Sequence, residues 1–279
     1  MSRIVVFGAG FLGHRFEKEV PGAVLSRADI TDKKAVLSAL REARADAVIN
    51  CAGKTGRPNV DWCETHQSET YRANVIGALT LADACREADT YLMHLASGCI
   101  FYGERPGGGG WREDDHANPS GFYSRTKYAA DLVLSRLPNV GIARLRMPID
   151  DAPGDRNLIT KLSRYPEVID VENSVTVVSD LVAAVVKLVD QRATGVFHVV
   201  NPGRMRHRDL LALYREVVDP NHDFRLIRDE DLVARGLALA SRSNCVLSSD
   251  RLAALGISLR PIEEALREVM TRYRDAVRR

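Results

Sequence analysis

The sequence has few of the features that mark disulfide-bonded, zinc-binding or membrane proteins. It contains five cysteines, an odd number, and no two of them form a C-x-x-C pair, which argues against a disulfide framework and against a metal site. No apolar run reaches the roughly 20 residues of a membrane span, and the run at residues 4–7 is too short for a signal peptide. These absences predict a cytoplasmic protein with no membrane partner.

Neither positive nor negative charge predominates in the sequence. The formal net charge is +2 over 279 residues, and basic side chains alternate with acidic ones instead of forming blocks. Nucleic-acid-binding surfaces are normally strongly basic, so no nucleic-acid partner is expected. The composition favours an enzyme that acts on a small molecule.

Short apolar runs alternate with longer amphipathic runs along most of the chain. This alternation predicts βα units, and the almost continuous apolar strands predict a parallel sheet covered on both faces. The fold class is therefore α/β, a doubly wound Rossmann sheet of at least seven strands. The predicted strands include residues 3–7, 23–26, 47–50, 91–96, 141–146 and 195–200, and helices are predicted up to about residue 20 and over residues 32–43, 60–87, 122–137 and 181–189.

The first predicted strand runs into a dinucleotide-binding signature, Gly-x-Gly-x-x-Gly, followed by a helix. Glycines at these positions permit a tight turn and a close approach of the backbone to a pyrophosphate, which then lies on the amide groups of the helix N-terminus. The cofactor loop is predicted to comprise Gly8, Gly10, Phe11, Leu12 and Gly13.

The end of the second predicted strand bears on the choice of cofactor. No acidic residue closes this strand, where NAD-selective sites hold the ribose hydroxyls. Arg27 follows it and could face a 2′-phosphate, although a solvated surface arginine would look the same. NADP(H) is the predicted cofactor and NAD(H) the alternative. Ala52 and Gly53 follow the third strand and are predicted to form a wall of the cofactor site.

A tyrosine and a lysine four residues apart, Tyr123 and Lys127, begin a predicted helix and should share one face of it. A free phenol titrates near about 10, so a nearby cation would lower its pKa and let it exchange a proton near neutrality. We expect Lys127 to provide this cation and to hold the cofactor ribose.

Two further candidates, Ser97 and Cys99, follow the predicted strand at 91–96 and should lie at its carboxyl end. Ser97 can donate a second hydrogen bond to a ketone oxygen. The Cys99 thiol can act as an acid or base, but a cysteine in this position is more often a packing residue, so from the residues alone its role stays open.

The later part of the chain follows a different pattern. After residue 148 the βα alternation loosens, and the run Gly107–Gly110 predicts a loop near the mouth of the site. We therefore predict an NADP-binding Rossmann domain from residues 1–148 plus about 172–200. Residues 149–171 and 201–279 are predicted to form a small C-terminal α/β cap that binds the substrate.

Taken together, these stretches resemble the extended short-chain dehydrogenases that reduce 4-keto-6-deoxy sugar nucleotides. This group includes the dTDP-4-dehydrorhamnose reductases and the bifunctional nucleotide-rhamnose synthases. The similarity runs nearly end to end, and two features resemble the bifunctional subgroup in particular: the run at 56–64 and the cysteine at position 99. The matching segments are residues 56–64, 97–101, 122–127, 144–149 and 157–161.

The resemblance implies a role for each matching residue. Cys99 and Lys161 would be the acid and base of a 3,5-epimerisation, while Ser97, Tyr123 and Lys127 would carry out a reduction. Asp29 and Ile30 would lie beside the adenine, and Asn74 would help to hold cofactor or sugar nucleotide. The substrate-binding set implied by the resemblance is Arg57, Asn59, Asn157, Lys161, Arg242 and Asn244.

The predicted function is the conversion of an NDP-4-keto-6-deoxyglucose to NDP-β-L-rhamnose by 3,5-epimerisation and NADPH-dependent 4-keto reduction. Two alternatives remain: a 4-reductase that lacks epimerase activity, and a non-catalytic NADP-binding regulatory subunit. The sequence does not distinguish a uridine from a thymidine nucleotide. A homodimer is expected only because it is the commonest assembly.

Overall fold

The computed structural model describes residues 2–278 and divides them into two compact units. The first unit comprises residues up to Ile100, Ala117–Arg144 and Val182–Phe197. The second comprises Phe101–His116, Leu145–Leu181 and the residues from His198 onward.

A six-stranded sheet forms the centre of the first unit. Its strands are β1 (Ile4–Phe7), β2 (Val24–Ser26), β3 (Ala47–Asn50), β4 (Tyr91–Ser97), β5 (Val140–Leu145) and β10 (Gly195–His198). They lie in the order β10-β5-β4-β3-β1-β2, and β1 pairs in parallel with both β2 and β3. The chain therefore changes direction across the sheet between β1 and β3. In open parallel sheets such a switch point marks the crevice in which ligands bind.

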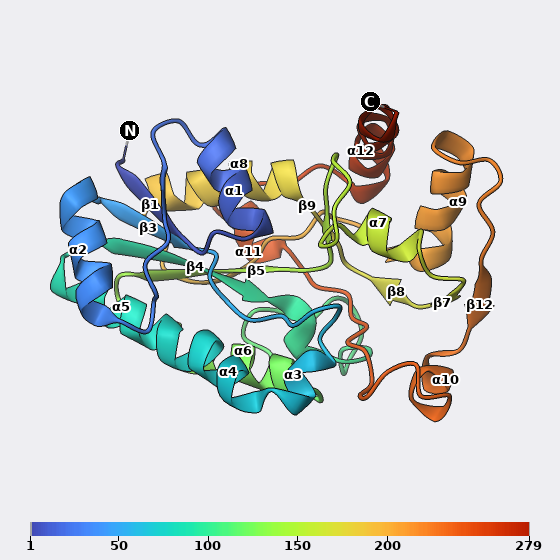
Figure 1. Cartoon of the computed structure of the whole chain (residues 1–279), viewed down its shortest axis with the longest axis horizontal. Helices are drawn as coiled ribbons and strands as arrows, with labels where there is room; N and C mark the ends of the chain where they lie inside the picture. Colours follow the sequence, from blue (N-terminus) through green and yellow to red (C-terminus); the bar gives the residue numbers. More distant parts are fainter. Residues whose placement is uncertain (1, 279) are drawn as a thin grey trace. The chain divides into compact units, whose positions relative to one another are not determined.

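Helices cover both faces of this sheet (Figure 1). They are α1 (Phe11–Glu19), α2 (Lys33–Ala43), α3 (Trp62–Thr65), α4 (Gln67–Tyr71), the π-helical segment η1 (Arg72–Gly77), α5 (Ala78–Glu87), the short 3₁₀ turn η2 (Gly98–Ile100), α6 (Phe122–Leu134) and α8 (Val178–Asp190). Helices α2, α5 and α6 cover one face, while α1 and α8 cover the other. This arrangement confirms the doubly wound parallel α/β fold.

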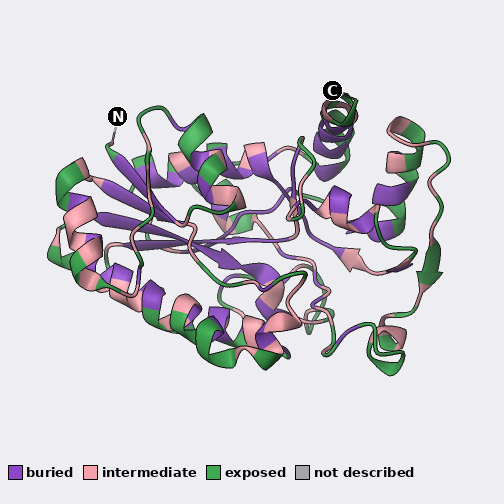
Figure 2. Cartoon of the chain, viewed as in Figure 1, coloured by how far each residue is buried: buried purple, intermediate pink, exposed green. Residues whose placement is uncertain are grey.

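Burial follows the apolar pattern of the sequence (Figure 2). All residues of β1, β3, β4 and β5 are buried, as expected for strands with helices on both sides. The prediction of at least seven strands was wrong for this sheet, which has six. The strands outside this sheet have only two or three residues each.

The second unit is built from short strands and helices. Its strands are β6 (Pro148–Ile149), β7 (Glu167–Ile169), β8 (Glu172–Asn173), β9 (Thr176–Val177), β11 (Met205–Arg206) and β12 (Arg225–Ile227). Its helices are α7 (Leu158–Leu162), α9 (His207–Val217), α10 (Asp229–Ala234), α11 (Asp250–Ala254) and α12 (Ile262–Val277). A separate apolar cluster, which includes Ile159, Leu210 and Met270, forms its core.

The division into units differs from the predicted domain boundaries at residues 101–116 and 172–181, and by a few residues at 145–148 and 198–200. The glycine-rich stretch at 101–116 is irregular, but it belongs to the second unit because Trp111 exchanges backbone hydrogen bonds with Val246 and Ser248. Residues 172–181 also belong to the second unit, although we had assigned them to the first. Residues 101–116 and 172–181 join the second unit through contacts between residues that are far apart in the sequence. Periodicity along the chain does not reveal such contacts.

Within residues 2–278, no helix is long and apolar enough to cross a membrane. The same residues contain no cluster of three or more His, Cys, Asp or Glu side chains that could hold a metal ion. None of the five cysteines, all of which lie in the described part of the chain, forms a disulfide.

Candidate active site

The switch point of the sheet brings the ends of β1 and β3 into close contact. Gly8, which follows β1, has φ +98°, and a Cβ at this position would lie 2.4 Å from the backbone nitrogen of Ala52. Only glycine fits such an approach at this backbone angle. The loop after β1 and the chain after β3 therefore lie in close contact, and both carry residues that the sequence assigns to the cofactor site.

The other two glycines of the motif have different surroundings. A Cβ at Gly13 would lie 2.0 Å from the carbonyl oxygen of Gly8, so this glycine lets α1 pack against the loop. A Cβ at Gly10 would meet no atom within 4 Å. The backbone at Gly10 is thus open to a large group at the N-terminus of α1, and the loop fits a dinucleotide pyrophosphate.

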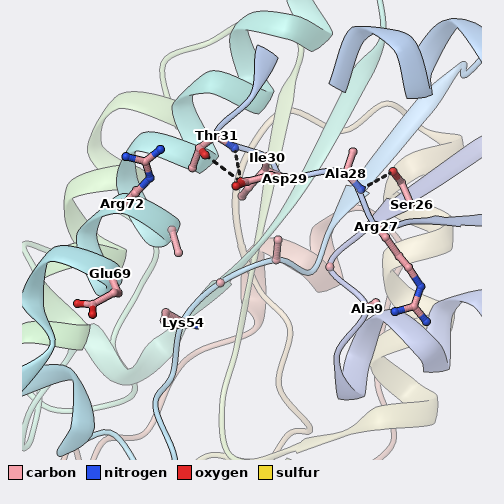
Figure 3. Close-up of a pocket in the computed structure, with 14 residues that line it drawn as sticks. Ala9, Ser26, Arg27, Ala28, Asp29, Ile30, Thr31, Lys54, Glu69 and Arg72 are labelled. Carbon is pink, nitrogen blue, oxygen red and sulfur yellow. Dashed lines mark hydrogen bonds between the residues drawn. The ribbon is translucent and has the colours of Figure 1, made fainter. Parts of the chain in front are cut away.

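A cavity of about 470 Å³ extends from this loop past the end of β2 (Figure 3). Six predicted cofactor residues line it: Gly8, Arg27, Asp29, Ile30, Ala52 and Gly53. The remaining predicted cofactor residues are not among its lining residues. Eight further residues line the cavity, and they include Thr31, Lys54, Glu69 and Arg72. These four residues come from the chain after β2, from the chain after β3 and from the helical segment at 67–77. Periodicity along the sequence does not reveal that these segments lie close together.

Arg27 and Asp29 are both exposed in this cavity, and Ile30 is buried. The Asp29 carboxylate accepts hydrogen bonds from the backbone and the hydroxyl of Thr31, at 2.8 and 2.9 Å, and these bonds lower its pKa. Figure 3 shows the Arg27 side chain extending beside Ala9, on the other side of the β2 loop from Arg72. Arg27 and Arg72 therefore lie on opposite sides of the cavity, and Lys54 is a third cation in its lining.

Ser97, Cys99 and Tyr123 form a polar cluster at the carboxyl end of β4. Tyr123, in the first turn of α6, shares a hydrogen bond with Ser97, and Cys99 interacts electrostatically with the same phenol. The Ser97 hydroxyl also accepts the backbone N–H of Cys99 at 3.1 Å. Burial raises the pKa of Tyr123, and Ser97 lowers it only in part. This direction is the opposite of the lowering by Lys127 that we expected.

Lys127 lies one turn further along α6 and is buried. Its Nζ donates to the carbonyl oxygen of Leu95 at 3.1 Å and lies 3.3 Å from Nε2 of His94. Burial lowers the pKa of Lys127, and Asp131, on the next turn of α6, opposes that shift. His94 was not predicted as a site residue. The sequence offered one signal for it, because His94 is a polar residue within an apolar strand, three positions before Ser97.

Two contacts fix the helix that carries Tyr123 and Lys127. The Glu64 carboxylate accepts the backbone N–H of Phe122 at 2.7 Å, at the N-terminus of α6, where unpaired N–H groups and the helix dipole favour an anion. The Asn74 amide donates to the Thr126 hydroxyl at 3.1 Å and pairs with both backbone polar groups of Lys54. Asn74 thus connects the β3 loop to α6, which is a positioning role.

The predicted loop residues Arg57 and Asn59 follow β3 in the same unit. Arg57 is exposed, and the Asn59 side chain accepts the backbone N–H of Asp61 at 2.9 Å. Gly56 has φ +71°, and a Cβ there would lie 2.7 Å from the Cβ of Trp62. This close approach explains a glycine at the start of the run 56–64, which folds back on itself before α3.

Lys161 lies on α7 of the second unit and is half-buried. Burial lowers its pKa, and the positive charges of Arg156 and Arg242 lower it further against the opposing effect of Asp155. A lysine needs a lowered pKa to act as a base near neutral pH. The electrostatics of this unit therefore suit the role that the resemblance implies for Lys161.

Asn157 is fully buried and is the N-cap of α7. Its amide nitrogen donates to the carbonyl oxygens of Asp150 and Ala152, at 2.7 and 2.8 Å, and its oxygen accepts the backbone N–H of Ile159. Both amide hydrogens are used in these bonds. These hydrogen bonds position the start of α7, and the contact of Asn157 with substrate stays a prediction.

The segment that contains Arg242 and Asn244 is held by buried polar contacts within the second unit. Arg146 donates to the backbone oxygen of Ser243 and to the side chain of Asn173. The Asn173 amide donates in turn to the side chain of Asn244 at 3.3 Å. Arg242 and Asn244 are half-buried, so their polar groups reach the surface of this unit.

Several known proteins are similar to this chain in sequence and in fold. The bifunctional dTDP-4-dehydrorhamnose 3,5-epimerase/dTDP-4-dehydrorhamnose reductase of Arabidopsis thaliana is 37% identical over 92% of this chain and 87% of that protein. A trifunctional UDP-glucose 4,6-dehydratase/UDP-4-keto-6-deoxy-D-glucose 3,5-epimerase/UDP-4-keto-L-rhamnose-reductase of the same plant is 36% identical over 92% of this chain, which spans only 39% of that longer protein.

A solved structure and a family assignment agree with these relatives. The L780 UDP-rhamnose synthase of Acanthamoeba polyphaga mimivirus superposes with a TM-score of 0.90 at 28% identity, covering 97% of this chain and 99% of that one. The RmlD substrate binding domain family matches residues 3–275. These findings confirm the resemblance inferred from the sequence motifs, and the chain belongs to the RmlD substrate binding domain family.

Proposed function

We propose that the chain is an NADPH-dependent enzyme that converts an NDP-4-keto-6-deoxyglucose to NDP-β-L-rhamnose. It would invert carbons 3 and 5 and reduce the ketone at carbon 4. The observation that carries this proposal is the hydrogen-bonded pair of Ser97 and Tyr123, with the Cys99 thiol acting electrostatically on the same phenol. The names of the epimerase/reductase and UDP-rhamnose synthase relatives support the same chemistry.

In the reductive step, Ser97 and Tyr123 donate hydrogen bonds to the ketone oxygen, and Tyr123 gives its proton to that oxygen. When bound at the glycine loop, NADPH would supply the hydride to carbon 4. Because burial raises the pKa of Tyr123, the phenol is protonated at neutral pH, which is the state that a proton donor needs. Lys127 holds the ribose of the cofactor.

In the epimerisation, the hydrogens beside the ketone are acidic because Ser97 and Tyr123 stabilise the enolate. Lys161 removes a proton from one face, and Cys99 returns one to the other. The lowered pKa of Lys161 supports its role as base. Cys99 belongs to the first compact unit and Lys161 to the second.

We assign the cofactor to the first unit, which holds the glycine loop and its cavity, and the sugar nucleotide mainly to the second. Arg242 can pair with the diphosphate through its fork of donors, and Asn244 lies beside it. Arg57 and Asn59 would contribute from the first unit.

A cytoplasmic location is proposed because none of the described cysteines forms a disulfide. The homodimer stays a prediction.

The experiment that tests the proposal is proton NMR of the purified protein with dTDP-4-keto-6-deoxyglucose in deuterium oxide, first without and then with NADPH. We expect deuterium to enter carbons 3 and 5 before NADPH is added, and rhamnose to form afterwards. Cys99→Ala and Lys161→Ala should each slow the exchange by roughly 100-fold or more, as the loss of a general acid or base does.

Matched controls separate chemistry from folding. Cys63→Ala removes a fully buried thiol that also acts on the Tyr123 phenol, and Lys187→Ala removes an exposed lysine of α8; both should exchange normally. If no exchange occurs but a ketose that is already epimerised is reduced, the protein is a 4-reductase alone. If neither substrate reacts, the enzymatic proposal fails and a regulatory role in a protein complex becomes the better account.

The exposed Arg27 carries the proposed preference for NADP(H). Arg27→Ala should weaken the binding of NADPH by roughly 10- to 100-fold, the value of one or two charge-assisted hydrogen bonds, and leave NADH binding nearly unchanged. Binding can be measured by the fluorescence of the reduced nicotinamide. Arg72→Ala, on the other side of the cavity, is the control. If the loss appears there instead, the 2′-phosphate lies beside Arg72.

A further inference from the structure

A buried arginine and a buried asparagine lie beneath the segment that carries Arg242 and Asn244. Arg146 is the largest fully buried side chain of the described residues, with an exposed fraction of 1%, and Asn173 is 0% exposed. Burying a guanidinium and an amide costs free energy unless their polar atoms are hydrogen-bonded. Nη2 of Arg146 donates to Oδ1 of Asn173 and to the backbone oxygen of Ser243, so the buried charge is used to hold this segment.

The segment at residues 242–247 has the burial pattern of an extended chain. Every second residue of the run is buried, namely Ser243, Cys245 and Leu247. The residues between them, including Arg242 and Asn244, are half-buried. Successive side chains of an extended chain point to opposite sides, so Arg242 and Asn244 share the side that reaches the surface. A slip by one residue would turn both of them inward.

Contacts with single residues of the run prevent such a slip. Oδ1 of Asn173 accepts the backbone N–H of Cys245 at 3.1 Å in addition to the guanidinium of Arg146. The Ser243 hydroxyl donates to the carbonyl oxygen of Phe101 at 2.6 Å, and the carbonyl oxygen of Ser243 accepts from Arg146. Each of these hydrogen bonds requires one particular residue at its position. Arg146 and Asn173 therefore fix the register of the run.

The same donors fix the direction of the Asn244 amide. A guanidinium and a backbone N–H can only donate, so the atom of Asn173 that faces Arg146 and Cys245 must be the oxygen. The NH₂ group of Asn173 then faces Asn244 at 3.3 Å, and only the oxygen of Asn244 can accept it. The NH₂ group of Asn244 is turned the other way, where it lies 3.3 Å from the carbonyl oxygen of Arg242.

We propose that Arg146 and Asn173 are positioning residues for the sugar nucleotide, which set the place of Arg242 and turn the NH₂ group of Asn244 toward the diphosphate. The inference rests on the proposed function, because it deepens the diphosphate contact assigned there to Arg242. A guanidinium fork beside an amide donor suits the oxygens of a diphosphate. Arg146 and Asn173 act through the segment, since both are buried beneath it.

The charges around the segment agree with a site for an anion. The Asp229 carboxylate accepts a hydrogen bond from the Asn244 side chain; burial raises the pKa of Asp229, and this bond and the charge of Arg242 oppose that shift. A carboxylate thus lies at these donors, and a diphosphate oxygen takes its place. Burial lowers the pKa of Lys161, and the charges of Arg156 and Arg242 lower it further. Arg242 is therefore close enough to the proposed base for their charges to interact.

The test is the binding of UDP and of dTDP to the whole protein by isothermal titration calorimetry, with NADPH binding measured beside it. Asn173→Asp keeps the acceptor for Arg146 and Cys245 but cannot donate to Asn244. The Asn244 amide then turns its NH₂ group toward the new carboxylate and its oxygen toward the diphosphate. The nucleoside diphosphate should bind roughly 10-fold more weakly, the value of one charge-assisted hydrogen bond, while NADPH binds as before. In turnover, KM for the sugar nucleotide should rise and kcat should change little.

A double-mutant cycle shows whether the effect passes through Asn244. In an Asn244→Ala background, Asn173→Asp should weaken the binding of UDP or dTDP no further. A general loss of structure, or the added negative charge alone, would weaken binding in both backgrounds. Arg146→Met removes the donor to both Asn173 and Ser243 and should weaken binding by roughly 10-fold or more. Because the loss of a buried arginine can unfold a protein, Asn173→Asp remains the primary variant.

Asn201→Asp is the matched control, the same change at another fully buried asparagine of the second unit. It places a carboxylate beside Asp180, to which the Asn201 amide donates at 2.7 Å, so it should lower stability without altering the binding of UDP or dTDP. Unchanged binding in Asn173→Asp, or an equal loss in Asn201→Asp, overturns the positioning role and leaves the proposed function standing. A native protein that binds neither UDP nor dTDP overturns both.

Discussion

Replacing Tyr123 by phenylalanine is expected to lower the rate of ketone reduction by roughly 100- to 10,000-fold, the usual contribution of a positioned proton donor. The ring of phenylalanine keeps the packing of the tyrosine, so the loss reports the hydroxyl. Deuterium exchange at carbons 3 and 5 should continue at a reduced rate that falls less than the reduction does, because Lys161 and Cys99 still move those protons while Ser97 alone is left to stabilise the enolate. NADPH oxidation and proton NMR measure the two activities in the same sample.

Tyr128→Phe is the matched control, since Tyr128 lies on the same helix one residue past Lys127. It should reduce the ketone at the native rate. The pH profile adds a second check. The protonated phenol is the active form, and burial raises its pKa, so the activity that depends on Tyr123 is present at neutral pH and is lost only as pH rises beyond about 10, the ordinary value. A Tyr123→Phe enzyme with native turnover would remove the tyrosine from the mechanism.

Much of the fold could be predicted because parallel strands that are buried on both faces are apolar throughout. The predicted strand at 47–50 coincides with β3, and the run at 91–96 is one residue shorter than β4. The second unit could not be predicted in the same way. Its six short strands have two or three residues each, and strands of that length contain no period to detect.

The candidate site shows the same limit. Its glycines, Ser97 and Tyr123 could be found because each follows a recognisable strand or begins a helix. His94 could not, because its importance comes from a cross-strand neighbour and from a lysine 33 positions away in the sequence. The resemblance assigns Asn157 to the substrate, and its hydrogen bonds to the carbonyl oxygens of Asp150 and Ala152 are a local detail that no sequence pattern predicts.

The buried ion pair of Asp131 and Arg144 is expected to produce the largest loss of stability. Nε of Arg144 lies 2.8 Å from Oδ2 of Asp131, and the two side chains are only 5% and 1% exposed. Asp131→Ala leaves the guanidinium in the core without this carboxylate, which should lower the free energy of unfolding by about 3–5 kcal/mol. Urea titration would measure it, and the melting temperature should fall by roughly 6–20 °C.

An exposed pair of the same unit is the control for this prediction. Nη2 of Arg3 lies 2.8 Å from Oδ1 of Asp46, but these side chains are 57% and 36% exposed. Solvent screens such a pair, so Asp46→Ala should lower the free energy of unfolding far less than Asp131→Ala does. Asp131→Asn keeps the shape and one acceptor, and its loss should lie between the two. Equal losses from Asp131→Ala and Asp46→Ala would show that burial adds nothing to the Asp131 pair. In that case the carboxylate would serve to raise the pKa of Lys127, and its removal would alter the Lys127 titration more than the stability.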